Sequence, residues 1–404
     1  MELTQRLAQL SSELIKDRAA AAPSILGKLV LARGLYGIGT TRFLMLGMYE
    51  QPMKRWPETM SYFKDIEPGL RTLNWQGQGH RLTVDKLITT ERFTKAGIPT
   101  ARLLAVIGRD RTSHPHEGLF PSLSNVDEVT RTLGSAPDRL FIKPASGWRG
   151  QGAMGPERRE GRWLVEGEKL SDRELAQRLV STAPPTGLLM QERLRSHPDL
   201  MPIGGNLGLG CVRMNTALTV TGPEFLFAFA KIMGNAGLVD NFAGGKYGNL
   251  AAGVDKATGK LTRIYGRKPG RTFLIETFNT HPITRAMLVG FQLPMWSAVV
   301  SLAKRTAAAF PESPLVGSDI AITDEGPRVI EIQPDWESNI SQLTFGAGLR
   351  PILRDVVPRL AAPEHIKQRA MEQMGLTGSV RKWRKPPRAE RELESLQSRS
   401  SAAN

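Results

Sequence analysis

The chain has very little cysteine, since Cys211 is the only one among its 404 residues. A single cysteine excludes an internal disulfide framework, and a reducing cytoplasm is the simplest interpretation of where the protein works. Cys211 itself is expected to be a small residue within a strand rather than a nucleophile.

Long apolar runs are missing as well. We find no stretch of about eighteen apolar residues, which argues against a membrane-spanning helix. The N-terminal stretch "MELTQRLAQLSSELIKDR" has neither the apolar core nor the small-residue cleavage site of a secretory signal. Its apolar residues recur at helical spacing, which predicts a helix.

Acidic residues are in the minority, because 39 Asp and Glu stand against 54 Lys and Arg, for a formal net charge of +15. Residues 376–404 hold seven basic and three acidic residues, a net +4, which leaves +11 on the rest. Such a surface attracts anions, and nucleotides, phosphorylated substrates, acidic glycans and nucleic acid all stay open. For the basic stretch "RKWRKPPR", a solvated tail is favoured over contact with nucleic acid or a membrane.

The apolar pattern divides the chain into four parts. Residues 1–80 are expected to be mostly helical, and residues 81–195 mix helices with strands around a glycine-rich stretch. Residues 196–372 contain hairpins, with turns at "DKATGK" and at Asp324-Glu325-Gly326. Residues 373–404 are polar and basic and are expected to be disordered. Helices set apart from antiparallel hairpins predict an α+β protein rather than a doubly wound parallel sheet.

The stretch "LFIKPASGWRGQGAM", residues 140–154, joins an apolar strand that ends at Lys143 to a turn with three glycines. Glycine lets backbone amides approach phosphate oxygens, and lysine adds a point charge, so the pattern suits a polyphosphate. It is not a Walker A loop, and no helix follows it as a dinucleotide fold requires. Taken alone, these residues favour a plain hairpin with a loose loop.

Two further stretches bring polar groups to apolar strands. In "VGSDIAITDEGPRVIEIQ" period two places Glu331 and Gln333 on one face, and strand pairing could add Asp319. Two carboxylates and an amide oxygen suit Mg²⁺, although a solvated surface hairpin is an equal alternative. In "LLMQERL" the strand ends at Gln191-Glu192-Arg193, and a strand emerging into solvent is favoured when this segment is read alone.

The order of these segments resembles the ATP-grasp superfamily, most closely its sugar-transfer-associated branch, which is related to alpha-L-glutamate ligases. The resemblance covers about residues 80–345 and rests on "DK", "FIKP", "MQERLRSHP", "VRMNT", "VDNFAGG" and the hairpin. It implies an α+β ATP-grasp fold whose two subdomains clamp ATP, with ATP and Mg²⁺ as cofactors. The implied activity is a carboxylate–amine ligase that acts through an acyl phosphate, in natural-product or cell-envelope polysaccharide biosynthesis. The implied partners are small, anionic substrates rather than nucleic acid.

The resemblance also implies residue roles. The phosphates of ATP are contacted by Lys86, Lys143 and a lid that contains Ser146, Gly147, Gly150 and Gly152. Adenine and its sugar lie against Gln191, Glu192, Arg193, Leu194 and Asp199. Phosphoryl transfer is assisted by Arg213, Lys143 and Arg149. The Mg²⁺ ligands are Asp319, Glu331 and Gln333, the last standing where the family usually has Asn, so that the amide oxygen sits on a longer arm.

The acceptor substrate is expected near "VDNFAGGKYG", whose turn carries Asp240, Asn241, Gly244 and Gly245, with a structural turn as the equal alternative. His281 is a weaker candidate, as a general base on the substrate side. Two other functions stay open. One is a kinase that phosphorylates a hydroxyl, and the other is a non-catalytic nucleotide-binding scaffold in envelope-polysaccharide assembly.

Overall fold

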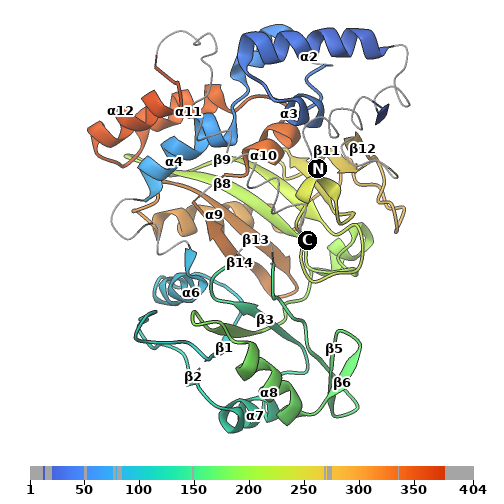
Figure 1. Ribbon diagram of the computed structural model, residues 1–404, viewed down its shortest axis with the longest axis vertical. Coiled ribbons are helices and arrows are strands. Elements are labelled where there is room, and N and C mark those ends of the chain that lie inside the picture. The colour runs from blue at the N-terminus through green and yellow to red at the C-terminus, as the bar shows by residue number, and fades with distance from the viewer. Residues whose placement is uncertain are drawn as a thin grey trace.

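The computed structural model describes residues 12–13, 21–49, 52–75, 79, 84–147, 150–267, 270, 275–334 and 336–377. Two β-sheets follow one another along the long axis of the molecule, and helices cover their outer faces (Figure 1). Within the ranges above, no helix is both long enough and apolar enough to cross a bilayer. The predicted disordered tail, residues 373–404, starts too early, because Gln373 ends a helix and Met374 and Leu376 are buried in the core. Residues 378–404 lie outside the described ranges.

The smaller sheet has four strands in the order β2-β1-β7-β3. They are β1 (Leu103–Ile107), β2 (Ser122–Leu123), β3 (Leu140–Pro144) and β7 (Leu188–Glu192). Successive strand residues point to opposite faces, and one face packs its apolar residues against α7 (Val126–Gly134) and α8 (Asp172–Thr182). Three short strands form a separate sheet beside it: β4 (Glu157–Arg159), β5 (Arg162–Val165) and β6 (Glu168–Leu170).

The other face of the small sheet is met by α6 (Lys86–Lys95), which also reaches the large sheet. Leu87, at its start, packs against Val106 and Leu189 of the small sheet. Phe93, near its end, lies edge-on against Phe310 with ring centroids 5.6 Å apart, in the core under the large sheet. The helix therefore fixes the two sheets against each other.

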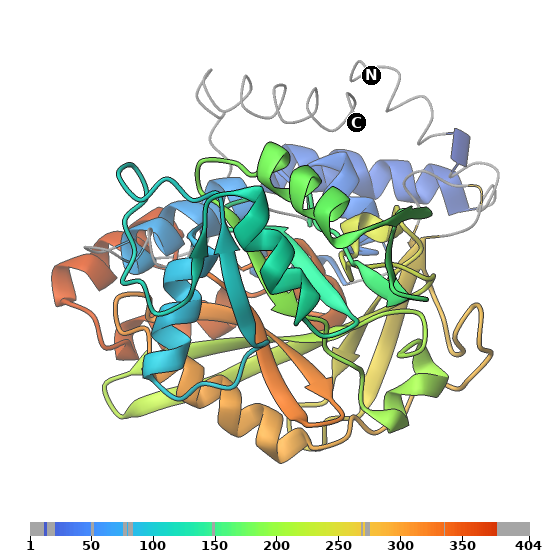
Figure 2. The same cartoon turned by 90° about the horizontal axis from the view of Figure 1, so that it is seen from below.

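The larger sheet has seven strands in the order β12-β11-β10-β9-β8-β13-β14, all antiparallel. They are β8 (Cys211–Thr219), β9 (Gly222–Ile232), β10 (Leu250–Val254), β11 (Leu261–Arg267), β12 (Ile275–Thr277), β13 (Leu315–Thr323) and β14 (Gly326–Gln333). The helix α9 (Trp296–Ala308) runs along one face and buries its apolar stripe there (Figure 2).

The opposite face of the large sheet is covered by helices from both ends of the chain (Figure 1). From the N-terminal side come α2 (Ala22–Tyr36), α3 (Thr40–Met45) and α4 (Glu67–Asn74), and from the C-terminal side α10 (Ser338–Phe345), α11 (Arg350–Val356) and α12 (Glu364–Gln373). Short turns of helix join the longer elements: η2 (Met53–Glu58), η3 (Tyr62–Ile66), η4 (Pro198–Ile203), η5 (Ala243–Gly245) and η6 (Val357–Arg359).

The α+β class is confirmed, as are both predicted hairpins. The turn "DKATGK" joins β10 to β11, and Asp324 and Glu325 join β13 to β14, where Thr323 pairs with Gly326. Ser171 begins α8 with a reciprocal capping box to Glu174, as its sequence indicates. The four-part division of the chain stays a prediction, although the N-terminal helices share their buried side with α10–α12.

Candidate active site

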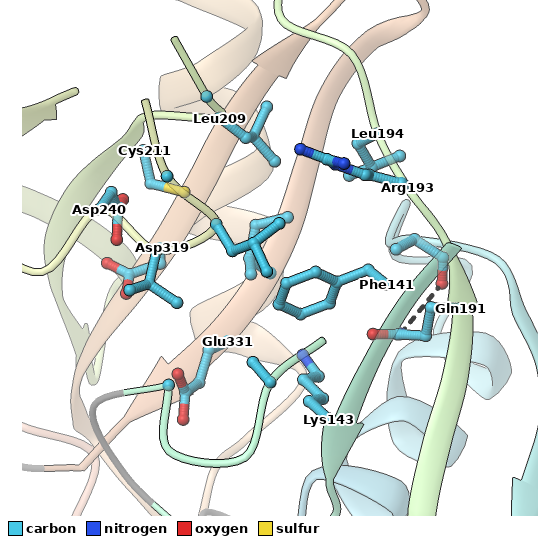
Figure 3. Close-up of a pocket in the computed structure, with 18 of the residues that line it drawn as sticks. Phe141, Lys143, Gln191, Arg193, Leu194, Leu209, Cys211, Asp240, Asp319 and Glu331 are labelled. Atoms are coloured by element: carbon cyan, nitrogen blue, oxygen red, sulfur yellow. Dashed lines mark hydrogen bonds between the residues drawn. The ribbon is translucent and has the colours of Figure 1, made fainter. Parts of the chain in front are cut away.

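A cavity of about 410 Å³ lies where the two sheets meet. In Figure 3, β3 and β7 form one wall, and the ends of β8, β13 and β14 form the other. Among the residues that line the cavity are many of the predicted site residues: Lys86, Lys143, Ser146, Gly147, Gly150, Gln191, Glu192, Arg193, Leu194, Asp240, Asn241, Asp319, Glu331 and Gln333. Segments that are more than 200 residues apart in the sequence therefore meet at one site.

On the first wall, alternation of side chains along β3 decides which of them face the cavity. In β3, Leu140 and Ile142 pack against α7 and α8, so Phe141 and Lys143 point the other way, into the cavity (Figure 3). Burial lowers the pKa of Lys143, the carboxylate of Glu331 opposes this, and Lys86 lowers the pKa again, which leaves it at about 8. This lysine therefore keeps its charge at pH 7 but loses it in mildly alkaline solution unless an anion joins it.

The start of α6 brings Lys86 to the same place. Asp85 caps the helix by accepting hydrogen bonds from the backbone N–H groups of Leu87 and Ile88, and its carboxylate is held by Arg109 at 2.5 Å. Lys86 Nζ donates to the carbonyl of Gly147 at 2.6 Å and lies 3.5 Å from Glu331 Oε1. Lys86 therefore connects the glycine-rich loop to the β13–β14 hairpin, which carries Glu331.

The glycine-rich loop needs glycine at several positions. Gly147, Gly150 and Gly152 have φ of 127°, 73° and 70°, a region that side chains disfavour. A Cβ on Gly150 would also approach Val239 Cγ1 to 2.4 Å. Gly152 is not among the cavity-lining residues, and the predicted role of Arg149 concerns a residue outside the described ranges.

The segment after β7 lines the cavity with both polar and apolar groups. Gln191 Nε2 donates to the carbonyl of Ala101 at 3.5 Å (dashed in Figure 3), and Glu192 pairs with Arg102 at 3.2 Å. Asp199 is not brought to the cavity, since it lies on η4 with its side chain 69% exposed. Its predicted contact with a sugar has no geometric support here.

The second wall is built on a buried ion network. Asp319 accepts from Arg213 Nε at 2.5 Å and Nη2 at 2.9 Å, and Lys231 donates to it at 3.0 Å. Lys231 also bonds Asp240 at 3.0 Å. The strand register explains this arrangement, because Asp319 stands opposite Arg213 on one side and Glu331 on the other. Arg213 itself is not a cavity-lining residue and acts behind Asp319.

The charges in this network stabilise one another. Burial alone would raise the pKa of Asp319, but Arg213 and Lys231 outweigh burial and hold that pKa well below its usual range. Burial likewise disfavours the charged forms of Arg213 and Lys231, yet the neighbouring carboxylates raise both pKa values. All three groups are therefore ionised at neutral pH. Nearby, burial and then Asp240 raise the pKa of the Cys211 thiol, which keeps it protonated.

The chemistry of the second wall suits a hard cation. Oxygens of Glu331 and Gln333 line the cavity, and Asp240 Oδ2 is buried with no hydrogen-bond partner. Both oxygens of Asp319, however, accept hydrogen bonds from cations. In the described ranges, no three His, Cys, Asp or Glu side chains group closely enough to hold a metal alone. Mg²⁺ commonly binds through one or two carboxylates together with substrate phosphates, and this set of oxygens fits that mode. The three predicted metal ligands stay a prediction.

The expected acceptor-binding residues are split between two places. Asp240 and Asn241 line the cavity, whereas the turn at Gly244 and Gly245 packs against Arg267 and does not. His281 is fully buried elsewhere, where its Nε2 contacts the carbonyl of Met233 at 2.8 Å and its Nδ1 accepts from the N–H groups of Ile283 and Thr284. Both ring nitrogens are therefore engaged in holding a loop.

Two residues of this site are missing from the sequence predictions. Lys231 lies in the apolar strand "EFLFAFAKIM", and a lysine in such a run signals a buried charge that needs a partner. Phe141 alternates with apolar residues that face α7 and α8, so period two alone assigns it to the same face as Lys143. Both signals are visible in the sequence.

Residues 72–357 match the family described as sugar-transfer associated ATP-grasp. No curated protein matched the chain. Among solved structures, N5-carboxyaminoimidazole ribonucleotide synthetase in its ADP complex is 13% identical with a TM-score of 0.35, covering 67% of this chain and 52% of that one. D-alanine–D-alanine ligase from Helicobacter pylori is 9% identical with a TM-score of 0.37, covering 71% and 61%. The chain thus spans about half the length of the first structure and about three fifths of the second.

Proposed function

Because the chain belongs to the sugar-transfer associated ATP-grasp family, we propose that it is an ATP-dependent ligase that joins a carboxylic acid to an amine. The main support for this proposal is one observation. The lysines and the glycine-rich loop on one wall of the cavity face the carboxylates of the β13–β14 hairpin on the other. Lys86 and Lys143 hold the phosphates of ATP under the loop at residues 146–152. Adenine lies between Phe141 and the segment Gln191–Leu194.

The proposed reaction has two steps that balance through an acyl phosphate, with no covalent bond between enzyme and substrate. An oxygen of the acid attacks the γ-phosphorus, the bond to the bridging oxygen breaks, and ADP leaves. The amine then attacks the acyl carbon, inorganic phosphate leaves, and the amine loses a proton. Such phosphoryl transfer requires charge neutralisation and in-line positioning more than covalent help. No thiolate is needed, which agrees with the raised pKa of Cys211.

The residues of this chain divide that work between the two walls. Lys143 and Lys86 neutralise the phosphates from one side, and the glycine-rich loop excludes water that would hydrolyse an acyl phosphate. Arg213 and Lys231 hold Asp319 in place on the other side. Glu331 and Gln333 are the residues that would hold Mg²⁺. When bound, the cation would offset negative charge on the β- and γ-phosphates.

Hydroxylamine trapping tests the proposed ligase directly. With ATP, Mg²⁺ and a panel of amino, hydroxy and sugar acids, we expect an acyl hydroxamate to form for at least one acid. Glu331→Ala should lower its rate by roughly 100- to 1,000-fold, since a residue that would hold the Mg²⁺ at the transferring phosphate is lost. A stable phosphorylated hydroxyl compound without hydroxamate would indicate the kinase instead. ATP binding without any turnover sensitive to Glu331→Ala would indicate the scaffold.

The affinity for ATP should depend on pH through Lys143. Its pKa of about 8 means that the side chain is charged below this pH and neutral above it. ATP affinity should therefore fall as pH rises from 7 to 9.5, by up to about tenfold per pH unit above the pKa. Isothermal titration at several pH values measures this. The Lys143→Met variant should lose the inflection, and an equal inflection in both proteins would assign it to another group.

A further inference from the structure

Asp240, which lies on the second wall of the cavity, has one carboxylate oxygen without a partner. Its Oδ1 accepts a hydrogen bond from Lys231 Nζ at 3.0 Å, whereas its Oδ2 is buried and bonds none of the residues that the structure describes. The neighbouring Cys211 keeps its proton, and a thiol is only a weak hydrogen-bond donor. A buried acceptor that stays unsatisfied costs free energy, so this oxygen needs an explanation.

The backbone on both sides of Asp240 is fixed by Asn249, which is buried. The side-chain amide of Asn249 donates to the carbonyls of Val239 and Asn241, each at 3.1 Å. Its Oδ1 accepts from the backbone N–H of Gly234 at 3.1 Å, so that one side chain ties the start, the middle and the end of this loop together. The position of the unpaired oxygen is therefore set by the fold of the loop.

Asp240 lies between the two parts of the site that are proposed to handle the phosphates of ATP. On one side, the adjacent Val239 packs against Gly150 of the glycine-rich loop, since a Cβ at Gly150 would come within 2.4 Å of Val239 Cγ1. On the other side, Lys231 Nζ bonds both Asp240 Oδ1 and Asp319 Oδ2, each at 3.0 Å (Figure 3). A group held by Asp240 would therefore lie beside the place where an acyl phosphate is expected.

The unpaired oxygen suits an ammonium group better than a metal ion. An ammonium already fits this carboxylate, because that of Lys231 binds its other oxygen. A Mg²⁺ ion shared by Asp240 and Asp319 would have to displace Lys231, whose Nζ bonds both carboxylates. An ammonium brings a positive charge and several N–H donors, whereas a hydroxyl brings one donor and no charge. Hydrogen bonds between charged partners are roughly twice as strong as neutral ones, so a carboxylate favours the amine.

We propose that Asp240 Oδ2 binds the ammonium group of the amine substrate and thereby selects amines over alcohols as acceptors. This inference rests on the proposed function, because it gives the second substrate of that ligase a place and a charge. The acceptor is then a primary amine that is protonated in neutral solution, as amino acids and amino sugars are. The ammonium loses one proton before its nitrogen attacks the acyl carbon and a second as the amide forms, and both are released to solvent.

Acceptors matched in shape test this inference on any acid that forms a hydroxamate. The panel pairs each amine with the corresponding alcohol, such as glycinamide with glycolamide and glucosamine with glucose, and the wild type should form amides but no esters. Asp240→Asn should lower kcat/KM for the amine at least about 30-fold more than for hydroxylamine, which is uncharged in neutral solution. Asp240→Glu keeps the charge and should recover part of the loss. Asp355→Asn, at a side chain that is 73% exposed, is the control and should behave like the wild type.

Losses of equal size with amine and hydroxylamine would place Asp240 at the Mg²⁺ or phosphate site and overturn the inference, as would esters that form as fast as amides. The selectivity of the wild type decides the matter even if a variant fails to fold, which thermal unfolding detects.

If no acid yields a hydroxamate, the proposed function fails, and binding then tests the ammonium site by itself. Saturation-transfer NMR with glycinamide in the presence of ATP should give a signal that Asp240→Asn lacks and Asp355→Asn keeps. No signal with the wild type, or an equal signal with Asp240→Asn, overturns the inference.

Discussion

Replacing Asp319 with alanine is expected to lower the free energy of unfolding by about 3–5 kcal/mol. The substitution leaves Arg213 and Lys231 without the carboxylate that both contact, while both stay buried with 4% and 6% of their side chains exposed. Most of the loss comes from Arg213, which is left as a buried cation without a partner, whereas Lys231 keeps its bond to Asp240. The net value of an intact buried ion pair is small by comparison.

Urea unfolding followed by circular dichroism measures this loss. Asp355→Ala is the matched control, because Asp355 also pairs with an arginine, Arg359, but is 73% exposed. Its removal should cost at most about 1 kcal/mol. Combining Asp319→Leu with Arg213→Met should recover part of the stability by removing a charge along with its partner. If Asp319→Ala costs no more than the control, water reaches the network and the burial described above is wrong.

The sign of the pH dependence follows from the same network. The pKa of Asp319 is lower in the folded state than in the unfolded chain, so its contribution is complete above about pH 4 and is lost only as acid protonates it in the fold. The pKa of Lys231 is raised, so its contribution is complete below about pH 10 and is lost only in stronger base. The stabilisation should be constant between these limits.

Replacing Lys143 with glutamate should abolish the thermal stabilisation that ATP confers. The change puts a carboxylate where phosphates are expected, in a site that already contains Glu331. Loss of one buried charge partner costs about 2–5 kcal/mol of binding, which is about 30-fold or more in affinity, and the added repulsion should bring the fall to about 100-fold or more. At ATP concentrations 100 times the wild-type Kd, a stabilisation of about 2.7 kcal/mol should almost disappear.

Differential scanning fluorimetry with and without ATP checks this result. Lys169→Glu on β6 makes the same charge change at a side chain that is 62% exposed, and it should leave the ATP effect intact. Lys143→Met separates loss of attraction from added repulsion and should give an intermediate result. If Lys143→Glu keeps the full ATP-dependent rise in melting temperature, the nucleotide lies elsewhere.

Local sequence patterns were enough to predict the strands and turns that form the site. Alternation in "LFIKP" and "VIEIQ" predicts which side chains share a face, and the turn residues of the β13–β14 hairpin predict where it turns. They do not predict the bulge between Asp319 and Ile320, which shifts the register so that Asp319 pairs with Glu331. These features depend on residues that are close in sequence. The ATP-grasp fold and the α+β class are accordingly confirmed, while the individual roles of the site residues remain predictions.

Arrangements that join distant strands were not predictable in this way. Arg213, Lys231 and Asp319 meet because β9, β8 and β13 are neighbours, and about 80 residues separate the end of β9 from the start of β13. His281 was predicted near the substrate from its neighbours in sequence, whereas in the fold it is buried and its ring nitrogens bond the backbone of Met233 and Ile283. Strand order decides such contacts, and a single sequence does not encode it in a short-range pattern.

The two ends of the chain cover the same face of the large sheet, and this affects how the protein is made. The backbone N–H of Met60 donates to Gln342 Oε1, across 282 residues, and Asn74 bonds the carbonyl of Leu315, across 241. At about 5–20 residues per second, a ribosome needs about 15–60 s to supply the second partner of the first pair. During that interval the apolar sides of α2 and α4 have emerged without the helices that complete their core. We therefore expect the N-terminal helices to complete their packing only after the C-terminal helices have been synthesised.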